Sequence, residues 1–475
     1  MRTTNVLTYK TVGLALLLLL WCGGSRTSAE SNEQTQLSAK GHFPYPASLR
    51  PQVEFWKKIF GTHSKFQSVI HDAENMKVYK VLDFRPLIDE EGLDEAIVYQ
   101  IKQDQTKLEI ERIRSILLTL HKCSPNCQGL NAEEQKVWNL YRNVKGQDKF
   151  QQAAGEDRLR SQTGVKERFA EGIRVSRRYL KAMEAIFRQT GVPVELTRLP
   201  FIESSFNVQA YSKVGAAGIW QFMPATGRMY NMRINNLVDE RRDPLIASEA
   251  AARFLKANYE KLGTWPLAIT AYNHGPAGMA AAVDAVGTTD IETIIKSYKG
   301  SRFGFASRNF YPEFLAALQV EKNFADHFGP LHTETPLVHE KVTVDLPIPL
   351  RTAARFAGTD EEELILLNPA LSETVRAGRA AIPQHYGLRI PSGALGGFLK
   401  AYSPWQSEEK ARLAALERAR KAKLASSKKT KRTRQVAKRG QAKTANKKAV
   451  VKAKSTTRNS VREAQADEKS KKPRG

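Results

Sequence analysis

Helical periodicity over long uninterrupted stretches constrains the fold of this chain most strongly. Residues 93–121 contain neither Gly nor Pro and carry apolar residues at helical spacing. Residues 132–144 repeat the pattern, and residues 165–190 form a third such stretch that Gly and Pro residues close. One short alternating stretch, residues 77–82, indicates a strand. The sequence therefore predicts a mainly α-helical protein.

The N-terminal segment has the features of an export signal. A basic start precedes an apolar stretch, residues 12–21, and small residues follow at 27–29. The apolar stretch is too short to span a bilayer comfortably, so we predict a signal peptide over residues 1–29 and an exported protein. Cys22 leaves a lipid anchor open as an alternative, although Trp21 stands where lipoprotein signals have a small residue.

The positive charge of the chain lies mostly at its C-terminal end. Residues 407–475 hold 24 Lys and Arg residues against 6 Asp and Glu residues, and so carry +18 of the formal net charge of +25. They have almost no aromatic residues, and burial of so little apolar surface does not offset the entropy of ordering the segment. We therefore predict a disordered basic tail over residues 405–475. Outside the cytoplasm its charge would attract it to anionic envelope surfaces rather than to a specific nucleic acid.

Two cysteines stand close together at Cys123 and Cys127. A close, even pair in an exported protein favours a disulfide. A metal site is the weaker alternative, because no second pair of ligands completes it. We expect no metal.

The residues that suggest chemistry are concentrated at positions 199–227. Glu203 directly follows an apolar run, residues 199–202. A carboxyl group held against apolar side chains resists ionisation, because its charged form loses hydration there. A carboxylic acid that stays protonated near neutral pH is suited to general acid catalysis. Glu203 is therefore the candidate catalytic residue.

Three motifs follow one another around this acid. They are E-S-x-F-N at residues 203–207, S-x-x-G-A-x-G-x-x-Q-x-M-P-x-T at residues 212–226, and A-Y-N-x-G at residues 271–275. This ordered set resembles the lytic transglycosylases with a goose-type-lysozyme-like catalytic domain, and within them the membrane-bound lytic murein transglycosylase D group. The resemblance implies a lysozyme-like helical domain that acts on peptidoglycan glycan strands without a cofactor.

The resemblance also implies a mechanism with a single acid. Glu203 would protonate the glycosidic oxygen between N-acetylmuramic acid and N-acetylglucosamine, and would then act as a base while the sugar's own C6 hydroxyl attacks C1. The product would be a 1,6-anhydromuramic acid end, and an intramolecular hydroxyl benefits from high effective concentration. The substrate-binding residues that the resemblance implies are Ser204, Ser212, Gln221, Phe222, Met223, Tyr272 and Asn273. From the residues alone, Phe206, Trp220, Phe222 and Met223 are as readily core positions as subsite walls.

Other carboxylates and one departure from the family pattern qualify this interpretation. Ordinary glycosidases use two carboxylates, but Asp239 and Glu240 are interpreted as a solvated turn and Asp243 as a helix N-cap before Pro244. Relatives often carry R-N-Y-V near the end of the domain, where this chain has Phe310 in place of the tyrosine. That change removes a hydroxyl or transfers its role to Tyr311.

The domain organisation follows from these segments. We predict a helical N-terminal region at residues 43–164, the lysozyme-like catalytic domain at residues 165–330, and a small α+β module at residues 335–393. In this module a β-α-α-β order, with L-N-P at residues 367–369 and L-R-I-P at residues 388–391, resembles a diverged LysM domain. That family binds chains containing N-acetylglucosamine, and a small non-binding domain is the alternative.

Two other functions remain open. In a hydrolytic muramidase, water would replace the C6 hydroxyl. In a non-catalytic wall-binding scaffold, the site would be dormant. The export signal and the resemblance together predict a location in the periplasm or cell envelope, with outer-membrane association as an open alternative.

Overall fold

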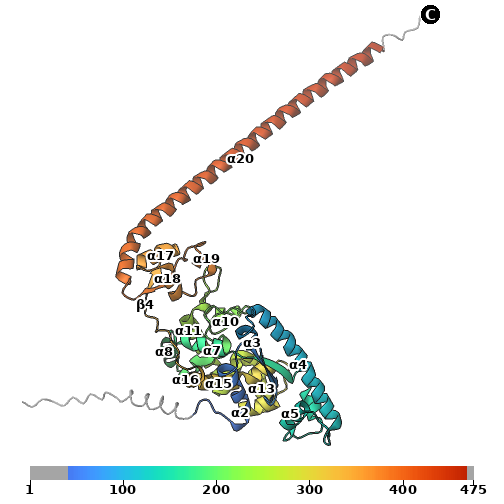
Figure 1. Ribbon diagram of the computed structural model, residues 1–475. Coiled ribbons are helices and arrows are strands. Elements are labelled where there is room, and N and C mark those ends of the chain that lie inside the picture. Colours follow the sequence, from blue (N-terminus) through green and yellow to red (C-terminus); the bar gives the residue numbers. More distant parts are fainter. Residues whose placement is uncertain (1–40, 468–475) are drawn as a thin grey trace, which may run out of the picture. The chain divides into compact units, whose positions relative to one another are not determined.

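The structure is a computed structural model that describes residues 41–467. The described residues group into two compact units, one of residues 41–338 with Asn368–Ala377 and one of His339–Leu367 with residues 378–467. The described residues are mainly helical, as the periodicity predicts (Figure 1). The predicted signal peptide and the lipid-anchor alternative at Cys22 lie outside the described residues. No helix within residues 41–467 is both long enough and apolar enough to cross a membrane.

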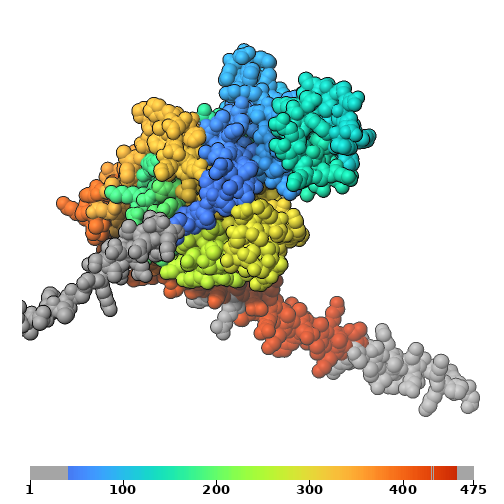
Figure 2. Space-filling model, turned by 90° about the horizontal axis from the view of Figure 1, so that it is seen from below, coloured from blue at the N-terminus to red at the C-terminus, as the bar shows by residue number. Residues whose placement is uncertain are grey.

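The first part of the first unit combines helices with a three-stranded antiparallel sheet of order β2-β1-β3. Its elements are η1 (Ala47–Leu49), α2 (Arg50–Gly61), β1 (Gln67–Asp72), β2 (Val78–Asp83), α3 (Arg85–Asp89), α4 (Glu95–Cys123), α5 (Ala132–Tyr141), α6 (Lys149–Ala153) and β3 (Leu159–Thr163). The predicted strand is confirmed as β2, and the first two predicted helices are confirmed as α4 and α5. The sequence did not predict β1 or β3, because β1 is buried along its whole length and β3 is largely exposed, so neither has the apolar alternation of a half-buried strand. The teal residues around α5 and α6 form a knob on the surface of this unit (Figure 2).

A buried carboxylate fixes the sheet to α5. Asp72 at the end of β1 is fully buried. It accepts two hydrogen bonds from Arg158, at 2.9 and 2.6 Å, and one from the Tyr141 hydroxyl at 2.6 Å. A charge removed from water needs such partners, so these bonds hold β1, α5 and the start of β3 together. Nearby, Cys123 and Cys127 form the expected disulfide.

The remainder of the first unit is a cluster of helices. Its elements are α7 (Lys166–Ser176), α8 (Leu180–Thr190), η2 (Val194–Arg198), α9 (Leu199–Glu203), α10 (Pro224–Met229), η3 (Glu240–Arg242), α11 (Pro244–Leu262), α12 (Trp265–His274), α13 (Pro276–Val286), α14 (Ile291–Ser297), α15 (Phe305–Lys322) and α16 (Phe324–Phe328). The prediction of one helix over residues 165–190 was wrong, since the helix breaks between α7 and α8. At the break, Arg177 pairs with Glu321 and Arg178 with Glu334. These long-range ion pairs accompany a turn that the local pattern does not indicate.

One hydrophobic core joins α2 to the helices α7, α9 and α15. The Trp56 indole of α2 donates a 3.0 Å hydrogen bond to Asn309 of α15. The ring of Phe169 on α7 stacks on Phe60 of α2 and on Phe201 of α9. The predicted boundary near residue 164 therefore separates segments that share a core.

The second unit contains a two-stranded sheet and helices. Its elements are β4 (His339–Val344), α17 (Leu350–Ala357), α18 (Glu361–Leu367), β5 (Tyr386–Pro391) and α20 (Leu395–Asp467). The strands are antiparallel, with Val342 opposite Leu388, and the β-α-α-β order is as predicted. The short α19 (Glu373–Arg376) belongs to the segment Asn368–Ala377, which is grouped with the first unit.

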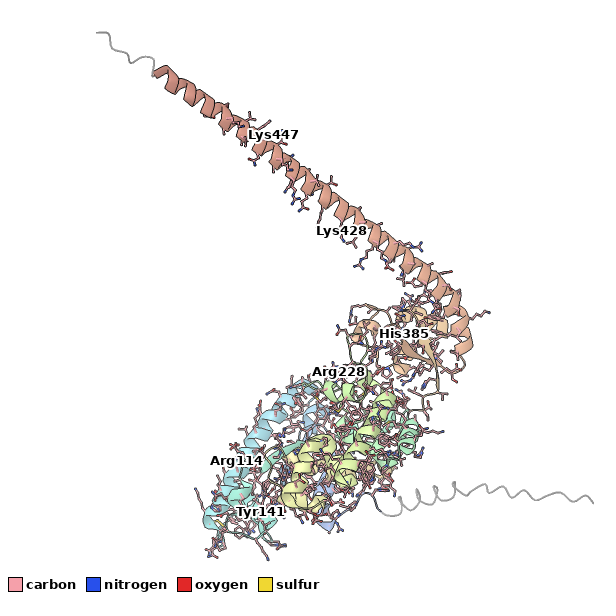
Figure 3. The ribbon with its side chains drawn as sticks, turned by 180° about the vertical axis from the view of Figure 1, so that it is seen from behind. Arg114, Tyr141, Arg228, His385, Lys428 and Lys447 are labelled. Atoms are coloured by element: carbon pink, nitrogen blue, oxygen red, sulfur yellow. A yellow bond between two sulfur atoms is a disulfide. The ribbon has the colours of Figure 1, made fainter. Side chains whose placement is uncertain are left out.

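The C-terminal segment differs from the prediction. We expected disorder from residue 405, but α20 continues as a helix to Asp467. Only its beginning packs, through Phe398 and Tyr402, and basic residues such as Lys428 and Lys447 are exposed along the rest (Figure 3). The composition argument considered burial alone. Ala, Lys, Arg and Gln are strong helix formers, and this local preference does not need a core.

Candidate active site

The candidate acid, Glu203, is the last residue of the short helix α9. Leu199, Pro200 and Phe201 of this helix are buried, while the Glu203 side chain keeps partial contact with solvent. Its enclosure by protein raises the pKa of Glu203 to about 8, because the charged form is poorly solvated there. The group is therefore protonated near neutral pH, in agreement with the sequence-based expectation.

A strained turn sets the direction of the chain after Glu203. Ser205 and Phe206 both adopt positive φ angles, 52° and 56°, which are uncommon for residues other than glycine. Phe206 is completely buried. Gly172 of α7 makes room for this turn, because a Cβ at that position would lie 2.7 Å from the Ser205 carbonyl oxygen. The turn is thus held by the core on one side and by α7 on the other.

The second motif forms a compact loop that is tied to α9. The Ser204 hydroxyl donates a 2.9 Å hydrogen bond to the Ile219 carbonyl oxygen. Within the loop, Ser212 Oγ accepts a hydrogen bond from the Ala216 backbone N–H at 2.9 Å. Gln221, at a φ of 48°, donates from Nε2 to the Gly218 carbonyl oxygen at 2.8 Å. Ser204 therefore joins the acid-bearing helix to the motif loop, and it is also the C-cap residue of α9.

A buried arginine that the sequence analysis missed organises this loop. Arg241 is 2 % exposed and donates to the carbonyl oxygens of Gly215 at 2.7 Å and Phe222 at 2.9 Å. Asp239 accepts from the same guanidinium at 2.9 and 2.7 Å. The interpretation of Asp239 as part of a solvated turn was therefore wrong. Asp243 does cap α11, as predicted, by accepting from the backbone N–H groups at positions 245 and 246.

The third motif brings Tyr272 and Asn273 to the same region from α12. The Tyr272 hydroxyl donates a 2.9 Å hydrogen bond to the Trp220 carbonyl oxygen. Burial raises the pKa of Tyr272 well above its usual value, and the charge that Glu203 can carry raises it further. Asn273 accepts a 3.2 Å hydrogen bond from Ser307 of α15. Glu203, the motif loop, Tyr272 and Asn273 therefore form one connected site.

The four apolar candidates divide into core and surface residues. Phe206, Trp220 and Phe222 are at most 3 % exposed, so they belong to the core. Met223 is 42 % exposed and is the member of this set that presents its side chain to solvent.

The two aromatic residues near the family's tyrosine position are also buried. Phe310 is 5 % exposed. The buried Tyr311 donates a 2.6 Å hydrogen bond from its hydroxyl to the Pro44 carbonyl oxygen. Tyr311 therefore does not take over the missing hydroxyl at position 310.

A second acid that was not predicted, Glu313, lies on α15, which packs against α9. Burial raises the pKa of Glu313 to about 8, and the charge that Glu203 can carry contributes to this shift. The only signal in the sequence is an acidic residue between Pro312 and Phe314 in an otherwise apolar run.

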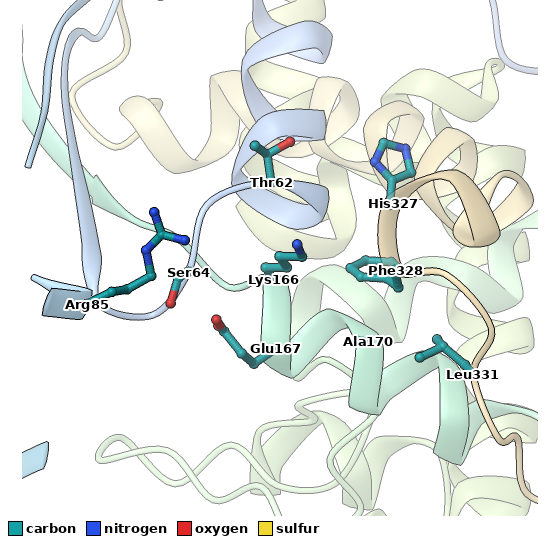
Figure 4. A pocket seen from close by; sticks show the side chains of 9 residues that line it. All are labelled: Thr62, Ser64, Arg85, Lys166, Glu167, Ala170, His327, Phe328 and Leu331. Atoms are coloured by element: carbon teal, nitrogen blue, oxygen red, sulfur yellow. The ribbon is translucent and has the colours of Figure 1, made fainter. Parts of the chain in front are cut away.

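Other sites are few in the described part of the chain. Residues 41–467 contain no group of three or more His, Cys, Asp and Glu side chains that could hold a metal ion. A pocket of about 480 Å³ is lined by residues of α7 and α16 and the turn after α2, but does not include Glu203 (Figure 4). It is therefore separate from the candidate active site.

Residues 182–295 match the family model of the transglycosylase SLT domain. This part of the chain is therefore similar to SLT domains. The matched residues include Glu203, the motif loop, Tyr272 and Asn273, whereas Glu313 lies beyond them.

Two curated proteins are similar over part of their length. Membrane-bound lytic murein transglycosylase D of Escherichia coli (strain K12) is 29% identical over 184 residues, which cover 38% of this chain and 40% of the relative. A protein named for tributyltin chloride resistance, from Alteromonas sp. (strain M-1), is 32% identical over 109 residues, which cover 23% of this chain and 53% of the relative. The chain thus spans about half the length, or less, of these relatives.

Among solved structures, the 70 kDa soluble lytic transglycosylase of Escherichia coli is 13% identical with a TM-score of 0.28, over 64% of this chain and 55% of that one.

Proposed function

We propose that this protein is a peptidoglycan lytic transglycosylase that cleaves the β-1,4 bond between N-acetylmuramic acid and N-acetylglucosamine and leaves 1,6-anhydromuramic acid ends. The observation that carries the proposal is the pKa of about 8 of Glu203, which occupies the end of α9 within the SLT domain. An acid that is protonated near neutral pH can supply the proton that the leaving sugar needs.

The proposed reaction needs one acid and no water. Glu203 gives its proton to the glycosidic oxygen, the C1–O bond breaks, and N-acetylglucosamine leaves with a hydroxyl group. Positive charge develops at C1 while Glu203 is a carboxylate. The C6 hydroxyl of the muramic acid then attacks C1 and returns its proton to Glu203. The atoms balance without a cofactor, and the acid is restored for the next cycle.

The surrounding residues fit support and binding roles. Gln221 uses its Nε2 for Gly218, so its amide oxygen is available to a sugar hydroxyl or N–H group. Ser212 accepts a bond at Oγ and keeps its own hydroxyl proton for the substrate. Met223 and Asn273 are exposed enough to contact a glycan, whereas Ser204, Phe222 and Tyr272 support the site from within.

The decisive experiment is digestion of purified peptidoglycan by the mature protein and by Glu203→Gln, with the products identified by mass. We expect anhydromuropeptides from the first protein and none from the second. Reducing-end products that disappear in the variant would instead identify a hydrolytic muramidase. No products from either protein, with both still sedimenting with the wall, would identify a non-catalytic scaffold.

The remaining parts of the proposal concern location and partners. A relative named as a membrane-bound lytic murein transglycosylase and the predicted N-terminal export signal support a location in the periplasm or cell envelope. The β-α-α-β module is proposed to bind glycan as a LysM-like domain, which sedimentation with peptidoglycan tests. The basic residues of α20 are proposed to contact anionic envelope surfaces. Sedimentation with vesicles containing phosphatidylglycerol, lost at high salt, tests that contact.

A further inference from the structure

A short segment from the C-terminal part of the chain packs on the first unit. Residues Asn368–Ala377 come between α18 and β5 in the sequence, and yet they group with the first unit. We call them the docked segment. The Asp239 backbone N–H donates a 2.8 Å hydrogen bond to the Ala370 carbonyl oxygen. The Ser372 N–H donates one of 2.9 Å to the Leu237 carbonyl oxygen, and the two stretches of chain meet as a short antiparallel bridge.

A second contact of the docked segment is made by the side chain of Arg376. Its Nε donates to the Leu371 carbonyl oxygen at 2.7 Å and its Nη2 to the Pro369 carbonyl oxygen at 2.6 Å, so the guanidinium holds the segment in its own turn. Its Nη1 donates to Gln209 Oε1 at 3.0 Å. Gln209 comes two residues after the E-S-x-F-N motif. The docked segment is therefore fixed on both sides of the motif loop, before it at Gln209 and after it at residues 237–239.

The contact after the motif loop continues into the loop itself. Asp239, whose backbone N–H is bonded to the docked segment, accepts two hydrogen bonds from the Arg241 guanidinium. The same guanidinium donates to the carbonyl oxygens of Gly215 and Phe222. Between these two residues lies Gln221, at a φ of 48°, and such a backbone conformation persists only where the surrounding structure holds it. A continuous series of hydrogen bonds thus runs from the docked segment to the loop.

We propose that the docked segment is a positioning element of the active site, which holds the motif loop in the conformation that binds the glycan. This inference rests on the proposed function, in which that loop contacts the substrate. Glu203 is held separately, because Leu199 and Phe201 of its helix lie in the hydrophobic core. Loss of the docked segment should therefore raise KM and leave kcat nearly unchanged. Residues 182–295, which match the family model, are in this proposal incomplete without the docked segment.

Ser372→Pro detaches the docked segment with little strain inside it. Ser372 has a φ of −69°, which is close to the value that a proline ring imposes. Proline has no N–H, and its ring occupies the space through which the bond to Leu237 passes. The Ser372 carbonyl oxygen still accepts from the Val375 and Arg376 N–H groups. The matched control is Glu373→Pro at the first position of α19, where proline is readily accepted and both docking bonds remain.

Steady-state kinetics on soluble glycan strands, prepared from purified peptidoglycan, give KM and kcat for wild type and the two variants. We expect Ser372→Pro to raise KM about tenfold, the equivalent of one or two backbone hydrogen bonds, with little change in kcat. Glu373→Pro should follow wild type. A wild-type KM for Ser372→Pro, or a fall in kcat alone, would overturn the proposal.

Backbone hydrogen exchange, read by mass spectrometry, follows the loop without any catalysis. In the motif loop the Ala216 N–H is bonded to Ser212 Oγ and the Gly218 N–H to the Ala210 carbonyl oxygen. We expect peptides from this loop to exchange faster in Ser372→Pro, while peptides from β3 exchange at the wild-type rate. Loop exchange that stays at the wild-type rate in a folded Ser372→Pro would overturn the proposal.

A second variant serves if exchange is faster throughout Ser372→Pro, which would mean that this variant does not fold. Arg376→Ala removes the contact with Gln209 and keeps both backbone bonds, and Arg379→Ala, at an exposed position, is its control. We expect a smaller rise in KM, about threefold, with faster loop exchange. Wild-type values of both quantities would overturn the proposal.

The two readouts separate this inference from the proposed function. A wild type that releases no anhydromuropeptides, beside a variant with faster loop exchange, removes the proposed function and leaves the holding of the loop. A wild type that releases them, beside unchanged loop exchange and KM in the variants, removes only this inference.

Discussion

The high pKa of Glu203 makes the stability of the first unit depend on pH. Folding raises the pKa of this carboxyl from 4.5 to about 8. Below pH 4.5 it is protonated in both the folded and the unfolded chain. Between these values the unfolded chain releases its proton while the folded chain keeps it, so the free energy of unfolding falls as pH rises. Above pH 8 the loss is complete.

The size of the effect follows from the shift. One pKa unit corresponds to about 1.4 kcal/mol, so the Glu203 shift removes about 5 kcal/mol of unfolding free energy between pH 4.5 and pH 9. Glu203→Gln replaces the acid with a neutral side chain of the same size. The variant should therefore lack this part of the pH dependence. Its unfolding free energy should fall less between pH 5 and pH 9 than that of wild type.

Urea-induced unfolding at several pH values between 5 and 9 tests this prediction. Tryptophan fluorescence is a suitable probe, because Trp56, Trp138, Trp220 and Trp265 all lie in the first unit. Glu313 titrates in both proteins, so it does not account for the difference between them by itself. If the free energies of wild type and Glu203→Gln differ by a constant amount at all pH values, Glu203 titrates normally and the argument for a protonated acid fails.

Three further predictions concern the loop and the core. Gly218→Ala places a Cβ 1.9 Å from the Arg241 carbonyl oxygen at a φ of 75°, and should abolish peptidoglycan digestion. The control is Gly263→Ala, also at positive φ but with free space around it, which should lose only about 1 kcal/mol of stability. Full activity of Gly218→Ala would contradict the role of the loop. Arg241→Ala leaves Asp239 unpaired and should lower the unfolding free energy by about 3–5 kcal/mol in urea denaturation, while the exposed Arg228→Ala should change little. Tyr311→Phe loses the hydrogen bond to Pro44, which should cost about 1 kcal/mol of stability. Mass analysis of the peptidoglycan digest should find unchanged products, and loss of the anhydro products would place the Tyr311 hydroxyl in the reaction.

Local patterns predicted the elements and the acid well. The strand β2 and the helices α4 and α5 were visible in the sequence because each carries its own periodicity. The enclosure of Glu203 was predictable from the apolar residues directly before it. The capping role of Asp243 was likewise predictable, because it depends only on the adjacent Pro244 and the helix that follows.

Features that depend on distant residues could not be predicted in this way. Arg241 belongs to a charged segment, and only the folded loop shows that it holds the carbonyl groups of Gly215 and Phe222. Glu313 follows Glu203 by more than one hundred residues, and no spacing rule connects them. The tail prediction failed for the opposite reason: it considered the missing core and neglected the local helix preference of α20.

The joining of α2 to α15 has a consequence for the order in which the chain folds. Pro44 and Tyr311 are bonded across a sequence separation of 267 residues, and Trp56 and Asn309 across 253. A chain is synthesised at about 5–20 residues per second, N-terminus first. The apolar face of α2 therefore has to wait for its partner helix, and contacts of such long range are slow to form. Until α15 arrives, the apolar face of α2 lacks part of its cover and is open to aggregation.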